Sequence, residues 1–114
     1  MTYAHIIVAH QAPVAGITLN RPDAMNALTP EMLAEVHGAL RGIAADPAIN
    51  VVVMSGAGRA FCAGVDLKAL RARGVDLSSG NVGDDLNHGA RAVLEQIEAM
   101  PQATIAKVNG FCFT

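Results

Sequence analysis

The sequence is poor in aromatic side chains, with no tryptophan, one tyrosine and three phenylalanines among 114 residues. Proteins that bind single-stranded nucleic acid stack bases on such rings, so this scarcity argues against a base-stacking platform. Charge is also sparse, at 16% of the residues, and the formal net charge is only -2. Such a chain offers no electrostatic attraction to nucleic acid or to an anionic membrane, and we expect neither as a partner.

Cysteine is scarce as well. Cys62 and Cys112 lie far apart, and neither belongs to a CxxC pair or to a cluster with metal-ligand spacing. This usage is typical of reduced, partly buried thiols in a cytosolic protein, so we expect cytoplasmic localisation and no metal. The apolar stretch 6–20 is too short and too interrupted to span a bilayer, and the N-terminus lacks the positive region of a secretory signal.

Apolar residues, in contrast, make up 52% of the chain, enough for one packed domain. Their spacing predicts strands at 3–9 and 14–20 joined by a turn at 11–13, then a helix that begins at Pro30 and stops before Asp46, and a strand at 49–55. In the second half it predicts a short helix at 66–73, a surface loop at 74–85, a helix at 86–100 and a strand at 104–108. The continuous apolar runs predict that the last two strands are buried, the first of them on both faces. Strand, helix and strand in this order indicate an α/β fold with a crossover connection.

The glycines after the strand at 49–55 do not form a dinucleotide-binding motif. Gly56 and Gly58 would need a third small residue where Phe61 stands, and a long helix should begin at once. A second turn follows instead, which argues against a Rossmann site.

That second turn is the strongest candidate for chemistry. Ala63 and Gly64 allow a tight bend, and Asp66 stands where a helix would begin, able to cap its amides or balance its dipole. Backbone N–H groups at such a point, Val65 among them, can stabilise a developing negative charge, such as a thioester oxygen passing to an enolate. An ordinary glycine turn with a helix cap and no ligand explains the same residues, and the residues alone leave both interpretations open.

The remaining ionisable side chains form no catalytic set. The four glutamates fall on the polar faces of the two long helices, where solvent explains them, and the four histidines lack a nucleophile or metal partner. Asp84 and Asp85 suit a solvated turn better than a metal site. Cys62 is either a reactive thiol or a small packed residue, and Lys68 either pairs with a phosphate or is solvated.

Four stretches resemble the enoyl-CoA hydratase/isomerase, or crotonase, family: LNRPDAMNALTPEML, INVVVMSGAGRAFCAG, RAFCAGVDLKAL and IAKVNGFCFT. They occur in family order, and together they cover most of the chain. The resemblance implies an incomplete crotonase-type ββα spiral, in which the N–H of Val65 binds the acyl thioester oxygen. It also implies a substrate-binding set composed of Ala24, Met25, Ala27, Ala63, Gly64, Val65, Asp66, Leu67, Lys68, Gly110 and Phe113.

In the family, the second oxyanion donor and the proton-transferring glutamates follow the position of Phe113. We therefore expect residues 1–114 to be the N-terminal portion of one crotonase-like domain, truncated before the glycine-rich active-site turn and inactive alone. The implied activity of the complete enzyme is hydration of a 2-enoyl-CoA, with double-bond isomerisation as an alternative. Coenzyme A would be part of the acyl-CoA substrate, with no other cofactor, and the full-length chain would form homotrimers or hexamers. A non-catalytic module that binds CoA esters or assembles with full-length subunits is a further alternative.

Overall fold

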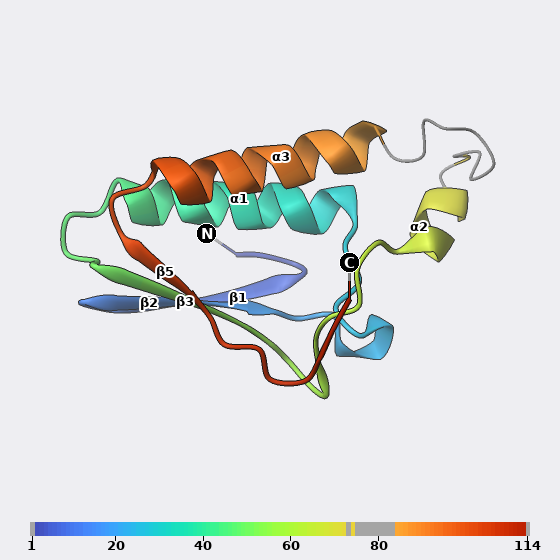
Figure 1. Ribbon diagram of the computed structural model, residues 1–114, viewed down its shortest axis with the longest axis horizontal. Helices are drawn as coiled ribbons and strands as arrows, with labels where there is room; N and C mark the ends of the chain where they lie inside the picture. The colour runs from blue at the N-terminus through green and yellow to red at the C-terminus, as the bar shows by residue number, and fades with distance from the viewer. Residues whose placement is uncertain (1, 73, 75–83, 114) are drawn as a thin grey trace.

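The computed structural model describes residues 2–72, 74 and 84–113 (Figure 1). Strands β1 (Ile6–Gln11), β2 (Val14–Leu19), β3 (Val51–Gly56) and β5 (Ala103–Ala106) form one sheet in the order β1-β2-β3-β5. Helices α1 (Pro30–Ala44) and α3 (Asp84–Ala99) both lie over the same face of this sheet. The predicted α/β class is confirmed.

The first half of the chain builds the predicted crossover. β1 and β2 pair antiparallel through a two-residue turn that contains a cis Ala12-Pro13 peptide. β2 and β3 pair parallel, so α1 is the crossover between them. α1 begins where predicted, because the Thr29 hydroxyl accepts a hydrogen bond from the Met32 N–H at 3.2 Å and Pro30 occupies the first turn.

The hydrophobic core lies between α1 and the sheet, and α3 closes it. The predicted apolar face of α1 is buried at Leu33, Val36, Leu40 and Ile43. From α3 and the residue that follows it, Val93 and Met100 are buried in the same cluster, which confirms the predicted face of the second helix.

The predicted burial of two strands is wrong. In β3 only Val52 is fully buried, and the other residues are partly exposed, because the helices cover one face of the sheet alone. All four residues of β5 are exposed. β5 is the edge strand, so one side of its backbone and one face of its side chains lack a neighbour among the described residues.

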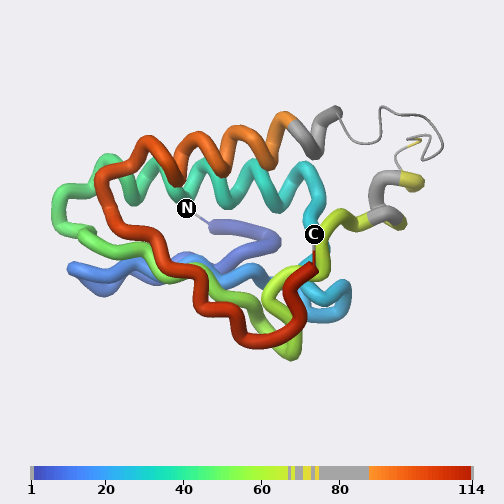
Figure 2. Tube along the Cα trace, viewed as in Figure 1, coloured from blue at the N-terminus to red at the C-terminus, as the bar shows by residue number. Residues whose placement is uncertain are grey.

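Two short strands were not predicted. β4 (Ala60–Cys62) and β6 (Phe111–Cys112) pair parallel and form a second small sheet. β4 stands where a Rossmann fold would begin its first helix, which agrees with the exclusion of that motif. The tube in Figure 2 shows the C-terminal segment returning to the end of the molecule where α1 begins.

The segment between the short helix α2 (Leu67–Ala72) and α3 was predicted as a surface loop over 74–85. Residues 75–83 lie outside the described part of the chain. Asp84 and Asp85 are the first residues of α3, so their assignment to the loop is wrong.

Candidate functional site

Two loops from distant parts of the chain meet at one end of the sheet. The first follows β2 and contains the 3-10 turn η1 (Pro22–Ala24), and the second follows β4. Their backbones are joined by a hydrogen bond from the Ala63 N–H to the Met25 carbonyl at 3.0 Å and by a parallel bridge between Leu28 and Val65. The two strongest motifs of the sequence therefore form one site.

Asn26 anchors the first loop. It is fully buried and has a left-handed backbone conformation, with φ of 58°, which asparagine tolerates better than most residues. Its side-chain oxygen accepts a hydrogen bond from the Arg21 N–H at 2.7 Å, and its amide nitrogen donates to the carbonyls of Ala57 at 3.0 Å and Ala60 at 2.9 Å. One side chain thus ties the η1 loop to the turn between β3 and β4.

The bridge sets the direction of the candidate donor. Leu28 donates its N–H to the Gly64 carbonyl at 2.6 Å and accepts at its own carbonyl from the Asp66 N–H at 3.0 Å. Successive peptide groups of an extended segment point to opposite sides, so the intervening N–H of Val65 is directed away from Leu28. Within the described residues this N–H has no hydrogen-bond partner.

Glycine is required just before the donor. Gly64 has φ of 94°, a conformation that side-chain-bearing residues rarely adopt, and this bend delivers the chain from β4 to the bridge.

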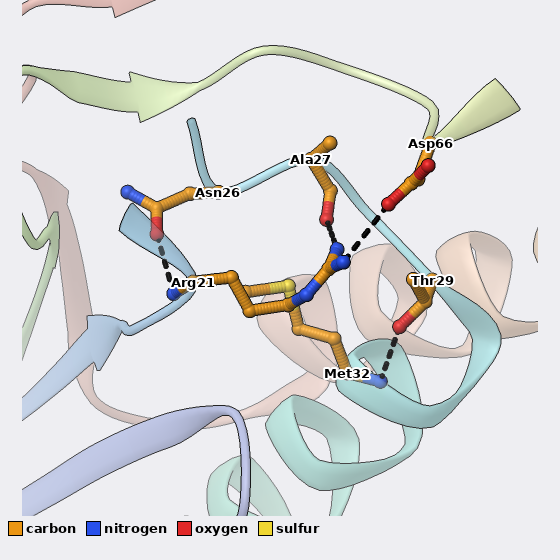
Figure 3. A network of polar contacts seen from close by, with 6 residues as sticks. All are labelled: Arg21, Asn26, Ala27, Thr29, Met32 and Asp66. Atoms are coloured by element: carbon orange, nitrogen blue, oxygen red, sulfur yellow. Dashed lines mark hydrogen bonds and ion pairs between the residues drawn. The ribbon is translucent and has the colours of Figure 1, made fainter. Parts of the chain in front are cut away.

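Arg21 spans the bridge with its guanidinium group (Figure 3). One terminal nitrogen donates to the Ala27 carbonyl, and the other forms an ion pair with the Asp66 carboxylate at 2.9 Å. The sequence predicted that Asp66 would act on the helix start, and it did not predict this ion pair.

A cleft of about 660 Å³ opens between the two loops. Among the residues expected to bind substrate, it brings together Ala24, Ala27, Val65, Asp66 and Lys68. Arg21 and Asp23 complete its lining. Val65 lines this cleft and is 39% exposed.

The other expected residues lie around the cleft rather than on its wall. Met25, Ala63 and Gly64 contribute the backbone contacts that hold the loops together. Leu67 begins α2, and its side chain falls outside the described part of the chain.

Gly110 and Phe113 belong to the segment around β6. A Cβ added at Gly110 would overlap the Arg59 carbonyl, so glycine permits the close approach of this segment to β4. The Phe113 N–H donates to the Cys62 carbonyl at 2.9 Å, and its ring stacks on Phe111 with 5.9 Å between centroids. Both expected residues thus lie beside the strand that leads into the candidate turn, without lining the cleft.

Cys62 fits the description of a packed residue. It is buried in the core cluster, and its sulfur accepts a hydrogen bond from the Gly64 N–H at 3.4 Å. Burial raises the pKa of this thiol above its usual range, which disfavours the reactive thiolate. Cys112 is exposed, so the expectation that it is partly buried is wrong.

One glutamate departs from the expectation of a solvated helix face. The Glu35 carboxylate is half-buried and accepts hydrogen bonds from the backbone N–H groups of Ala4 at 3.0 Å and His5 at 2.8 Å. Glu35 fixes the N-terminal segment to α1, because the N–H groups of Ala4 and His5 would lose these hydrogen bonds if the segment moved away. The contact is structural and lies outside the cleft lining.

Neither a metal site nor a membrane span is found. Among the described residues, no three His, Cys, Asp or Glu side chains gather closely enough to hold a metal ion. Over the same ranges, every helix is too short or too polar to cross a bilayer.

Sequence reasoning missed the roles of Arg21 and Asn26. The one available signal was that the two loops that carry the family resemblance have opposite charges, at Arg21 and at Asp66. The hydrogen bonds of Asn26 reach residues more than thirty positions away and leave no local pattern.

Comparisons with known proteins identify the family of the chain. The chain matches the family described as "Enoyl-CoA hydratase/isomerase" over residues 9–114. It is 36% identical over 111 residues to a probable enoyl-CoA hydratase of Rhizobium meliloti, a match that covers 97% of this chain and 40% of that protein. It is also 36% identical over 112 residues to the crotonyl-CoA hydratase of Syntrophomonas wolfei, covering 97% of this chain and 41% of that protein.

Solved structures give the same result. The crystal structure of an enoyl-CoA hydratase/isomerase from Xanthobacter autotrophicus Py2 matches with a TM-score of 0.83 at 38% identity, over 97% of this chain and 40% of that one. The chain spans about 40% of the length of the relatives that it matches. In sequence and in fold, the chain belongs to the enoyl-CoA hydratase/isomerase family.

Proposed function

We propose that this chain supplies an oxyanion donor and part of the acyl-CoA cleft of an enzyme that hydrates 2-enoyl-CoA thioesters. The observation that carries the proposal is the N–H of Val65, which has no partner among the described residues and belongs to a residue that lines the cleft. The relatives of this chain include a protein named crotonyl-CoA hydratase, which supports the proposed reaction.

The chemistry needs such a donor. When water adds its oxygen to C3 of an enoyl thioester, it gives up a proton to a general base, the C2–C3 π electrons move toward the carbonyl, and the thioester oxygen becomes an enolate oxygen. A proton then returns to C2, and the carbonyl re-forms. A backbone N–H fixed beside that oxygen stabilises the enolate more than the neutral thioester, typically by about 3–4 kcal/mol per donor.

The proton transfers require further groups. Of the two carboxylates in the cleft lining, Asp66 is paired with Arg21 and Asp23 is exposed on η1. We therefore propose that residues 1–114 bind acyl-CoA thioesters without turning them over. The same donor would serve a double-bond isomerase, and one relative, 32% identical over 103 residues, is named a dienoyl-CoA isomerase. Product analysis with 2-enoyl-CoA and 3-enoyl-CoA substrates distinguishes the two activities in the full-length protein.

A pair of ligands tests the role of Val65 directly. Butyryl-CoA has a thioester oxygen, whereas S-butyl-CoA is a thioether without one. If the N–H binds that oxygen, butyryl-CoA should bind about 3–10-fold more tightly, as one hydrogen bond is worth about 0.5–1.5 kcal/mol. Only the thioester should also shift the Val65 amide resonance in an NMR titration.

Two variants complete this test. Val65→Pro removes the N–H and should abolish the preference for the thioester, while Val65→Ala keeps the N–H and should retain it. Equal affinities of the wild-type protein for the two ligands, with an unmoved Val65 resonance, would overturn the proposal whether or not the proline variant folds.

A further inference from the structure

We infer that Arg21 is the positioning residue of the Val65 donor, an inference that rests on the proposed function. Arg21 need not touch the reacting atoms for this role. Leu28 and Val65 form the bridge that directs the donor. The Arg21 guanidinium contacts their neighbours, Ala27 before Leu28 and Asp66 after Val65.

The geometry gives Arg21 a hold on both sides of the bridge. One nitrogen is bonded to the Ala27 carbonyl and the other to the Asp66 carboxylate, so a slide or rotation of either segment must lengthen at least one of the two contacts (Figure 3). The bridge itself consists of two backbone hydrogen bonds, and one further backbone hydrogen bond, from the Ala63 N–H to the Met25 carbonyl, joins the same two loops. Arg21 restricts the same motion with a planar group whose donors are fixed relative to one another.

The base of the Arg21 side chain is fixed as well. Its backbone N–H donates to the buried Asn26 side chain at 2.7 Å, and its backbone carbonyl accepts from the N–H groups of Ala24 at 3.0 Å and Asn26 at 2.9 Å. The side chains of Arg21 and Asp66 are only 22% and 12% exposed, so solvent and salt screen their attraction less than that of a surface pair. Both ends of the Arg21 side chain are thus held by the protein.

An alternative role is a direct contact between Arg21 and an anionic group of the ligand. The observed geometry favours positioning, since both terminal nitrogens already have protein acceptors. Such a contact would require the guanidinium to leave the Asp66 carboxylate or the Ala27 carbonyl. The two roles differ in what they do to a ligand that lacks the thioester oxygen.

The experiment measures the affinities of the wild-type protein and of Arg21→Met for butyryl-CoA and S-butyl-CoA. Arg21→Met keeps the apolar part of the side chain and removes the guanidinium group. We expect the thioester preference to fall from about 3–10-fold to less than twofold, because one hydrogen bond is lost or misdirected. Because Arg21 also lines the cleft, the ratio of the two affinities, and not the affinity for either ligand alone, tests its role in positioning.

Two further variants separate geometry from charge and from non-specific effects. Arg21→Lys keeps the charge on a single nitrogen that cannot reach both acceptors, so it should lose the preference as well. It also serves if the methionine variant does not fold. Arg41→Met removes an exposed arginine from the opposite end of α1 and should leave both affinities unchanged.

Each outcome has a distinct meaning. A wild-type protein without thioester preference refutes the proposed function itself. A wild-type preference that persists in the Arg21 variants refutes positioning by Arg21 and leaves the proposed function intact. A loss of S-butyl-CoA affinity with the preference retained assigns Arg21 to ligand charge and also overturns the inference. A collapse of the thioester preference in the Arg21 variants, with the preference retained in Arg41→Met, supports it.

Discussion

Replacement of Asn26 by alanine should be among the most damaging single substitutions in this chain. The change removes an acceptor for the Arg21 N–H and donors to the Ala57 and Ala60 carbonyls. Ala60 keeps a second donor, the Asn109 side chain at 3.4 Å, so the groups that lose a partner are the Arg21 N–H and the Ala57 carbonyl.

The expected cost follows from these contacts. The Arg21 N–H and the Ala57 carbonyl are part-buried, so leaving each without a hydrogen bond costs about 1–2 kcal/mol, the lower part of the range for a buried group. Alanine at the left-handed φ of Asn26 adds about 1–2 kcal/mol. The free energy of unfolding should therefore fall by about 3–6 kcal/mol, a large part of the roughly 5–15 kcal/mol of a typical domain. Urea titration followed by circular dichroism measures this difference.

Asn109 provides a matched control. It makes the same number of side-chain hydrogen bonds to the β3–β4 region, accepting from the Gly56 N–H at 3.0 Å and donating to the carbonyls of Gly58 at 3.2 Å and Ala60 at 3.4 Å. Asn109 is exposed, so water replaces these bonds, and Asn109→Ala should cost only about 1 kcal/mol. Losses within 1 kcal/mol of each other in the two variants would refute the reasoning that burial makes Asn26 the anchor.

Three further outcomes can be measured on the same protein. Leu40 is 0% exposed, so Leu40→Ala should lower the free energy of unfolding by about 2–5 kcal/mol in urea titrations, through lost burial and a cavity. Thr29→Ala removes the cap on the Met32 N–H and should lower it by about 1 kcal/mol, whereas Thr29→Ser should cost less. Iodoacetamide should modify Cys112 well before Cys62, as mass spectrometry of peptides would show, because Cys62 is buried and its raised pKa keeps the thiol neutral. The same raised pKa implies stability that is present below the unfolded thiol's pKa and lost as the pH rises through the folded one.

The fold was predictable where the determinants are local. The period of the apolar residues in α1 and the Thr29-Pro30 start both act over a few residues, and both are confirmed. The exposure of β5 was not predictable, because its composition is that of a core strand while its place at the sheet edge depends on the whole topology.

The site was predictable only in part, for a similar reason. The turn at 63–66 could be identified from its glycine and from the family resemblance, and the structure places it beside the Leu28 segment. β4 and β6 escaped because strands of three and two residues carry no usable periodicity and gain their stability from pairing across the chain. Arg21 and Asn26 escaped because their partners are distant in sequence, so only the folded geometry reveals what each side chain holds.

The sheet order also constrains how the chain can fold. β1, β2, α1 and β3 are consecutive, and the partners Val14 and Val51 of β2 and β3 are nearer in sequence than the partners Val51 and Ala103 of β3 and β5. Loop-closure entropy delays such non-local pairing, which raises the contact order and slows the later steps.

We therefore expect residues 6–56 to form the early nucleus and β5 to dock last, with amide hydrogens of β5 exchanging through openings of lower free energy than those of β2. In this order the Leu28–Val65 bridge, which depends on a segment beyond β3, is completed after the nucleus. The donor of the cleft is then a late product of folding, assembled on a scaffold that is already in place.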